Sequence, residues 1–332
     1  MKTSSICTLS LAALLSLSLY GAETDQFYAS GATIKDSSAE MNNFFHGRIE
    51  FALSEVNKEN PDMNCRLVAK EVLDHVLGKF SLVHYIKERD FSKVSVFTQT
   101  SPLIDRFPDE SISDHDYRKH SIYENRTFPS NLVGIARTLN LNGVYIGTDK
   151  MGHFSIIGRT YYKNFLKALD DGLSEEEAQK KAIQKGFKQE VAFLGYTVGG
   201  TFSYGDLEAN YQGLQFGRNM CEGENPYLVK AGSLWVHNPK NQFDIKTYIN
   251  PKFDEAYNVS FWSPGMWKRM SKEIKRDYCK NNADKVFQAR YKSYQSFGSI
   301  QNFNDEMIAE FLKEKPKFDR QKQLLGVDCQ KL

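Results

Sequence analysis

The chain is poor in cysteine and proline, and it has no long apolar run after its N-terminal region. Of 332 residues, five are cysteine and nine are proline. No later apolar stretch approaches the roughly 20 residues that a membrane-spanning helix needs, so we expect no transmembrane segment there. Neither sign of charge dominates, because 43 Lys and Arg face 41 Asp and Glu, for a formal net charge of +2. This balance gives no electrostatic reason to expect a nucleic-acid partner.

Residues 1–22 have the pattern of a secretory signal peptide. Lys2 is followed by an apolar run over residues 6–20 and then by the small residues Gly21 and Ala22. We predict cleavage after Ala22, which would make the chain an exported protein of the periplasm or the extracellular space. Contact between the rest of the chain and a membrane would then be peripheral.

The cysteines that would remain after cleavage suggest disulfides. Removal of Cys7 with the signal peptide leaves Cys65, Cys221, Cys279 and Cys329. Four cysteines in an exported chain allow two disulfides with three possible pairings, and we favour Cys221–Cys279 with Cys65–Cys329. A zinc site is the alternative, but no CxxC or HxxxH spacing supports it.

Apolar residues recur with helical spacing over much of the chain, so we predict a mainly α fold. Capping-box spacing marks two helix starts, Ser37 with Glu40 and Ser174 with Glu177. The predicted helices cover residues 37–58, 65–80, 130–139, 149–169, 175–194, 204–219, 283–295 and 304–314.

We expect a helical domain over residues 23–220 and an aromatic-rich C-terminal layer over residues 221–332, packed on the same domain. Around residues 234–270 the layer is rich in aromatic residues, Pro and Asn, so we predict irregular structure there. Asp254 and Glu255 lie in this segment, but adjacent carboxylates rarely form the opposed pair of a glycosidase. A small aromatic core is the more common role of such a segment than stacking on sugars or on a partner. The aromatic residues concerned are Trp235, Tyr248, Phe253, Tyr257, Phe261, Trp262 and Trp267.

Between residues 90 and 130 the periodicity fades, and we predict a long polar loop. Four of its side chains, those of Asp114, His115, Asp116 and His120, are of types that bind metals. We interpret them as members of a solvated loop, which is the more common setting for such a polar run.

The stretch GTDKMGHFSIIG, residues 147–158, places an acid, an amine and an imidazole at the start of an apolar helix. Asp149 and His153 are four residues apart and therefore share a helix face. Asp149 also lies near the helix N-terminus, where the helix dipole favours a negative charge. These positions make Asp149, Lys150 and His153 candidate site residues.

A second stretch, TFSYGDLEANYQGLQFG at residues 201–217, carries a polar pair and two glycines on one helix face. Asp206, Asn210, Gly213 and Gly217 recur at steps of four, three and four. Glycine inside a helix costs about 1 kcal/mol relative to alanine. We therefore expect another helix to pack closely against this stripe and to meet the polar pair.

Together with Glu190, near the end of the intervening helix, these stretches resemble the VanZ-like proteins and the related YfiM-like periplasmic proteins. Those families carry a DKxxHF motif on one helix, a Glu on a middle helix and an SxxDxxxNxxG motif on a third. VanZ-like proteins usually span the membrane and often have an Arg shortly before the Ser, where this chain has Gly199 and Gly200. The resemblance, over residues 147–217, implies a cell-envelope location and a link to glycopeptide resistance, but it defines no reaction. The matching residues are Asp149, Lys150, His153, Phe154, Glu190, Ser203, Asp206, Asn210 and Gly213.

Three interpretations of this polar set remain open. Carboxylates and an Asp–His pair from neighbouring helices could bind a divalent metal that activates water, although Lys150 would repel the metal. Without a metal, His153 could be a general base oriented by Asp149 or Asp206, with Lys150 stabilising a developing anion. Ser203 fits a helix cap better than a nucleophile. The third interpretation is a structural hydrogen-bonded network that fixes the packing of three helices.

We therefore expect an exported cell-envelope protein with a polar pocket that binds an envelope-derived molecule, lipid-linked or of peptidoglycan type, and could also hydrolyse it. The alternative is a non-catalytic envelope protein with a structural polar network and an aromatic surface that binds a partner or a glycan. The candidate site residues are Asp149, Lys150, His153, Glu190, Asp206 and Asn210.

Overall fold

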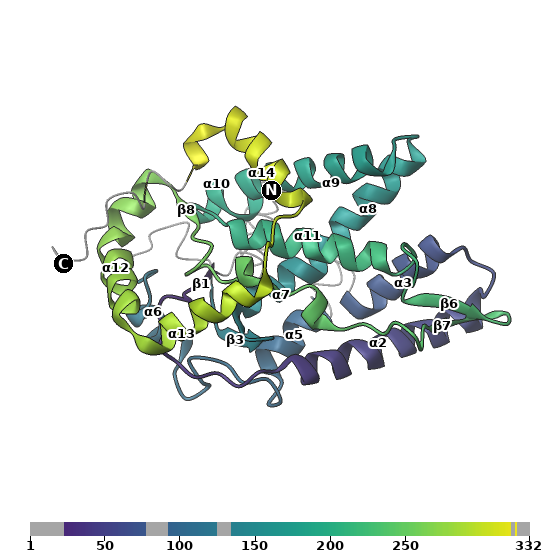
Figure 1. Cartoon of the computed structure of the whole chain (residues 1–332), viewed down its shortest axis with the longest axis horizontal. Helices are drawn as coiled ribbons and strands as arrows, with labels where there is room; N and C mark the ends of the chain where they lie inside the picture. Colours follow the sequence, from purple (N-terminus) through teal and green to yellow (C-terminus); the bar gives the residue numbers. More distant parts are fainter. Residues whose placement is uncertain (1–22, 78–91, 125–133, 320–322, 324–332) are drawn as a thin grey trace, which may run out of the picture.

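The computed structural model describes residues 23–77, 92–124, 134–319 and 323, and its architecture is mainly α (Figure 1). The fold class predicted from the sequence is therefore confirmed. Each sheet among these residues has two short strands. No helix of the described part is long and apolar enough to cross a membrane. The predicted signal peptide lies outside the described residues.

Two N-terminal helices, α2 (Ser38–Glu59) and α3 (Cys65–Leu77), occupy predicted positions and pack against each other. The capping box predicted at the start of α2 is wrong, because the Ser37 side chain makes no capping hydrogen bond to the helix. Its hydroxyl instead accepts the backbone N–H of Asp105 at 3.3 Å. A tertiary contact has replaced the local one at this position.

The long loop predicted over residues 90–130 is wrong, because the segment contains two short helices. They are α5 (Lys93–Thr100) and α6 (Asp114–His120). Each begins after a serine, Ser92 or Ser113, whose side chain accepts a backbone N–H. Helices of this length show too little apolar periodicity to be recognised, and the capping serines are the available signal.

The helix predicted over residues 130–139 is also wrong where the structure describes it. Strand β2 (Ile135–Ala136) is followed by β3 (Thr138–Leu141), which pairs antiparallel with β4 (Val144–Gly147). The intervening Asn142–Gly143 has positive φ at both residues, 56° and 78°, as a type I′ hairpin turn requires. The turn and its strand pairing override the weak helical periodicity.

One long helix carries the DKMGHF motif and changes type inside it. It runs as α7 (Thr148–Gly152), the π-helical turn η2 (His153–Ile157) and α8 (Gly158–Asp170). A π turn widens the backbone spiral locally and is frequent at functional sites. Here it begins at His153, one of the predicted site residues.

The next helix ends in a second π turn. It comprises α9 (Glu175–Gln189), opened by the predicted capping box at Ser174, and η3 (Glu190–Leu194), after which the short helix α10 (Tyr196–Gly199) follows. Glu190, which the sequence analysis places near this helix end, is buried, at 1% exposed. Both π turns therefore begin at candidate site residues.

The glycine stripe of α11 (Tyr204–Asn219) packs directly on α8, as predicted. A Cβ added to Gly213 would lie 2.0 Å from the carbonyl oxygen of Phe154 and 2.8 Å from Gly158 Cα. A Cβ added to Gly217 would likewise clash with an aromatic ring of α8. Because glycine has no side chain, the two backbones touch, and the polar residues of α11 lie beside η2.

The C-terminal layer contains more regular structure than predicted. Residues 234–270, predicted as irregular, include a hairpin strand and the start of α12 (Pro264–Ala283). Proline at the first helical position is a start signal, and here it marks that start. The other elements of the layer are β6 (Leu228–Ala231), β7 (Leu234–His237), η4 (Ile245–Thr247), η5 (Pro251–Phe253), β8 (Phe261–Trp262, paired with β5, Thr201–Phe202), α13 (Lys285–Tyr294), η6 (Gln295–Phe297), α14 (Phe303–Glu314) and η7 (Pro316–Phe318).

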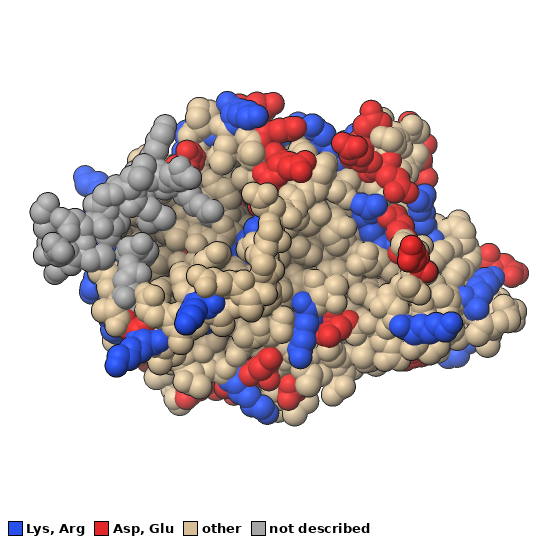
Figure 2. All heavy atoms as spheres, viewed as in Figure 1, with Lys and Arg blue, Asp and Glu red and all other residues tan. Residues whose placement is uncertain are grey.

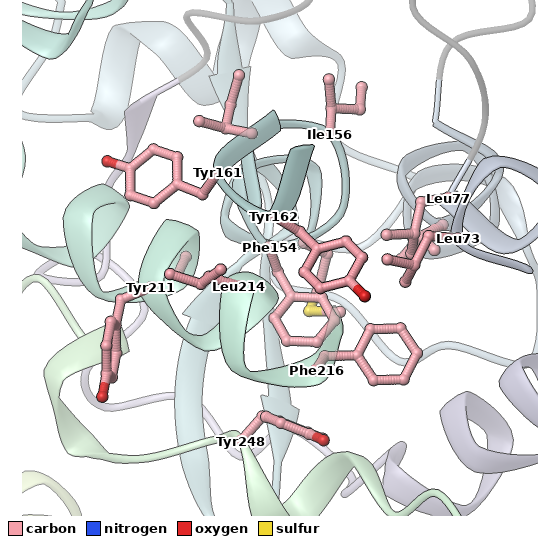
Figure 3. Close-up of a cluster of buried hydrophobic side chains, with 14 of the residues drawn as sticks. Leu73, Leu77, Phe154, Ile156, Tyr161, Tyr162, Tyr211, Leu214, Phe216 and Tyr248 are labelled. Carbon is pink, nitrogen blue, oxygen red and sulfur yellow. The ribbon is translucent and has the colours of Figure 1, made fainter. Parts of the chain in front are cut away.

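A continuous apolar core joins the helices to the C-terminal layer. Figure 3 shows Phe154 of η2 with Phe216 of α11 and, below them, Tyr248 of the layer. The ring centroid of Phe154 lies 5.7 Å from that of Phe216 and 5.7 Å from that of Tyr248. Most aromatic residues named in the layer are buried, and Tyr257 is the most exposed, at 44%. This burial favours a packing role for the aromatic segment.

The predicted disulfide pairing is wrong. Cys65, the first residue of α3, is bonded to Cys221, just after α11, with a Cα–Cα distance of 5.8 Å. Cys279 is also disulfide-bonded, and Cys329 lies outside the described residues. The pairing follows from the contact between α3 and α11, which the spacing of cysteines along the chain does not encode.

Candidate functional site

The six candidate site residues come together in one buried cluster, where the α7–η2–α8 helix meets η3 and α11. Each is at most 6% exposed. The three segments predicted from the sequence therefore do supply a common polar cluster. Its members are Asp149 and Lys150 from α7, His153 from η2, Glu190 from η3, and Asp206 and Asn210 from α11.

Lys150 occupies the centre of the cluster and is fully buried. Its ammonium nitrogen lies 2.7 Å from Asp149 Oδ2, 2.8 Å from Asp206 Oδ1 and 3.2 Å from Glu255 Oε1. Burial lowers the pKa of Lys150, but the three carboxylates outweigh burial and hold this pKa well above its usual value. The amine is therefore a fixed cation inside the protein.

His153 is held at both ring nitrogens. Its Nε2 lies 3.4 Å from Asp206 Oδ2, and its Nδ1 lies 3.2 Å from Asn210 Oδ1. The ring therefore lies between a carboxylate, which accepts hydrogen bonds, and a side-chain amide, which can both donate and accept them. Burial raises the pKa of Asp206, but the charges of His153 and Lys150 outweigh burial and bring this pKa below its usual value. In this geometry both ring nitrogens of His153 face partners inside the cluster, so neither is open to act as a general base.

Glu190 is the buried carboxyl group that η3 supplies to the cluster. Burial raises its pKa well above the usual value, and the negative charge of Asp206 raises it further. Glu190 Oε1 accepts the backbone N–H of Ser203 at 3.3 Å, whereas Oε2 has no hydrogen-bond partner among the described residues. An unsatisfied buried polar group costs about 1–3 kcal/mol. This oxygen therefore marks a position that a ligand or a water would stabilise.

Glu255 belongs to the cluster although the sequence did not identify it as a site residue. Its Oε1 accepts the hydroxyl of Ser203 at 2.5 Å, and that hydroxyl accepts the backbone N–H of Asp206 as the predicted cap of α11. Burial raises the pKa of Glu255, although Lys150 lowers it. Its Oε2 has no hydrogen-bond partner in the described part of the chain. No local motif marks Glu255, because other charged residues, among them Lys252 and Asp254, lie in the same aromatic segment.

The N-terminal strand also reaches the cluster. Strand β1 (Glu23–Thr24) pairs in parallel with β2, and the hydroxyl of Thr24 donates to Asp149 Oδ1. The carboxylate of Glu23 contributes to the raised pKa values of Glu190 and Lys150. No local motif marks these two residues, because their role depends on a strand pairing more than 100 residues away in the sequence.

The described residues contain no group of three or more His, Cys, Asp and Glu side chains that could hold a metal ion. In the polar cluster, the Lys150 ammonium lies between the carboxylates that a metal would require. The chain thus supplies its own cation at this position. The four side chains of metal-binding residue types that the sequence analysis noted between residues 90 and 130 are exposed on α6. They are those of Asp114, His115, Asp116 and His120.

Comparisons with protein-family models, with curated proteins and with solved structures find no match to this chain. The resemblance to VanZ-like and YfiM-like proteins therefore stays a prediction, and function has to be argued from the site. On the face shown in Figure 2, charges of both signs are interspersed.

Chemically, the cluster combines one fixed cation, Lys150, and an enclosed imidazole with carboxyl groups that have unused hydrogen-bonding capacity. The Lys150 ammonium and both ring nitrogens of His153 are already engaged by cluster residues. Glu190 and Glu255 each keep one buried oxygen that no described residue contacts by a hydrogen bond. Such an arrangement can bind a polar ligand through hydroxyl or amide groups while the Lys150 ammonium holds the carboxylates in place.

Proposed function

We propose that the chain is an exported cell-envelope protein whose buried polar cluster binds an envelope-derived molecule, lipid-linked or of peptidoglycan type. One observation carries this proposal: Glu190 Oε2 and Glu255 Oε2 are buried and have no hydrogen-bond partner among the described residues. Buried polar atoms in native proteins are nearly always paired. The sugar and peptide parts of envelope molecules are rich in hydroxyl and amide groups, which can both donate to and accept from a carboxyl group.

The energetics of the cluster also favour a functional role. Burying several ionisable groups is costly, and apolar residues of similar volume often stabilise a fold as well or better. Strongly shifted pKa values, such as those of Lys150 and Glu190, cluster at functional sites. Both π turns begin at cluster residues, His153 and Glu190, and such turns are frequent at functional sites.

Hydrolysis of the bound molecule would need a base as well as an acid. Glu190, with its raised pKa, is suited to protonate a leaving group. Both nitrogens of His153 are already engaged, so this residue would have to leave Asp206 before it could act as a base. The geometry therefore supports binding more directly than hydrolysis.

A structural network is the second candidate, and one observation favours it. Lys150 is fully buried and lies within 3.2 Å of three carboxylates. An ion-pair network of this kind can fix how helices pack. In that case the cluster would bind no ligand, and its residues would contribute to stability and fold specificity alone.

The variant His153→Ala separates the two candidates. Binding of purified muropeptides and of a lipid-linked disaccharide would be measured by calorimetry, and the free energy of unfolding by urea titration. The proposal expects binding to be lost under conditions in which the variant is folded. The structural candidate expects the free energy of unfolding to fall by about 1–3 kcal/mol, with no ligand effect.

His115→Ala is the matched control, because His115 is exposed on α6. It should change neither ligand binding nor stability. A wild-type protein that binds none of these molecules, combined with a large stability loss in His153→Ala, would contradict the proposed binding function.

A further inference from the structure

A second feature lies on the surface, where the end of α9 and the π turn η3 meet α14 and η7. A pocket of about 470 Å³ is formed there, within the range of about 300–1,000 Å³ usual for small-molecule sites. Helices α9 and α14 lie side by side at this place (Figure 1). The pocket is separate from the polar cluster, whose residues do not line it.

The floor of the pocket is apolar and preformed. Val191, Phe311 and Phe318 line it. The ring centroids of Phe311 and Phe318 are 5.6 Å apart, and the Phe202 ring behind them lies 5.5 Å and 4.8 Å from the two. Rings packed on one another in this way hold the shape of the floor without a ligand.

The rim of the pocket is basic. Its lining includes three lysines, Lys188, Lys315 and Lys317, and only one acidic residue, Glu314. The Lys317 ammonium nitrogen lies 4.9 Å from the ring centroid of Phe318, which places a cation over an aromatic ring at the mouth. The described residues supply no ion-pair partner to any of the three lysines. Their charges are therefore available to an external anion.

We infer that this pocket binds the acyl chain of a single-chain phospholipid with an anionic headgroup. The acyl chain matches the apolar floor, and a phosphate, with several acceptor oxygens, matches three ammonium groups better than one carboxylate would. A protein partner would need a broader surface of about 800 Å² than this small concavity offers. The inference does not depend on ligand binding by the polar cluster.

The test compares two probes with the same chain, 1-myristoyl-lysophosphatidylglycerol and 1-myristoyl-lysophosphatidylcholine, titrated below their micelle-forming concentrations into the folded protein. We expect the anionic probe to bind at least about tenfold more tightly. This preference should shrink in about 0.5 M NaCl, because salt screens exposed charges. Equal affinity for the two probes, or binding of neither, would overturn the inference.

Variants locate the binding to the pocket. The double variant Lys188→Glu/Lys317→Glu should weaken the anionic probe at least about tenfold and leave the zwitterionic probe almost unchanged. Val191→Trp should fill the floor and weaken both probes. Lys240→Glu/Lys246→Glu, at exposed positions outside the pocket, is the matched control and should change neither.

Two results separate this inference from the proposed function. His153→Ala should bind the anionic probe as the wild type does, because the polar cluster does not line the pocket. If Val191→Trp does not fold, the test rests on the affinity of the lysine double variant for the anionic probe, because that variant is altered only at exposed side chains. Wild-type affinity in that double variant would overturn the inference.

Discussion

Replacing Lys150 with methionine removes the cation at the centre of the polar cluster while keeping an unbranched side chain of similar length. Three carboxylates lie within 3.2 Å of the ammonium nitrogen, which is fully buried. Removing one partner of a buried ion pair usually costs about 3–5 kcal/mol. Because three carboxylates lose their cation here, we expect a loss of about 5 kcal/mol in the free energy of unfolding at neutral pH.

The loss should become smaller as the pH falls. Lys150 helps to hold the pKa of Asp206 below its usual value, so removing the amine raises the pKa of this carboxyl in the folded state. A group whose folded-state pKa is raised adds stability below its unfolded pKa and loses it as the pH rises through the folded-state pKa. The variant should therefore approach the wild type between neutral pH and about pH 4, where carboxyl groups take up protons.

Urea unfolding followed by circular dichroism, at neutral and at mildly acidic pH, measures both effects. Lys167→Met on α8 is the matched control, because Lys167 is exposed and its pair with Asp171 lies at the surface. Exposed pairs contribute little, so this control should unfold almost as the wild type does. A loss below about 1 kcal/mol in Lys150→Met, or a loss that does not change with pH, would refute the placement of Lys150 as the buried counter-ion.

Three further predictions test other parts of the structure. Glu190→Gln should match the wild type in stability at low pH and exceed it increasingly as the pH rises above 4.5, because the raised pKa makes ionisation of the buried acid costly in the folded state; urea titrations over a pH series measure this, and parallel curves would count against a neutral Glu190. Gly213→Ala should lower the free energy of unfolding by about 1–3 kcal/mol, because its Cβ would lie 2.0 Å from the Phe154 carbonyl oxygen; an unchanged urea midpoint would show that the helices are less close than described. Serine at both Cys65 and Cys221 should cost about 2–5 kcal/mol, since this disulfide closes a loop with a sequence separation of 156; identical melting curves for variant and wild type would contradict it.

The sequence predicts best where a signal is local. The helical periodicity of α9 and α11, the capping box at Ser174 and the close packing at Gly213 are all present in the structure. Each depends on residues within one or two turns of each other, or on a side-chain type with one clear physical use. The same locality explains why the residues of the DKMGHF motif could be chosen as site candidates.

The sequence predicts least where a role depends on tertiary pairing. Thr24 reaches Asp149 through the β1–β2 pairing, and Glu255 reaches Lys150 from a segment that has no motif. The partner of Cys65 is decided by the contact of two helices. The sequence also did not predict the role of Lys150. We expected its charge to repel a metal, whereas its ammonium group is itself the cation that the carboxylates surround.

The polar cluster has a consequence for the order of folding. Its members extend along the chain from Thr24, which contacts Asp149, to Glu255, which contacts Lys150. No partial chain ending before Glu255 contains the complete set, and closing such long loops is slow relative to local helix formation. The complete cluster therefore requires both ends of this span to reach α7. Burial of Lys150 with all three of its carboxylates therefore depends on long-range contacts and cannot be achieved by local helix formation alone.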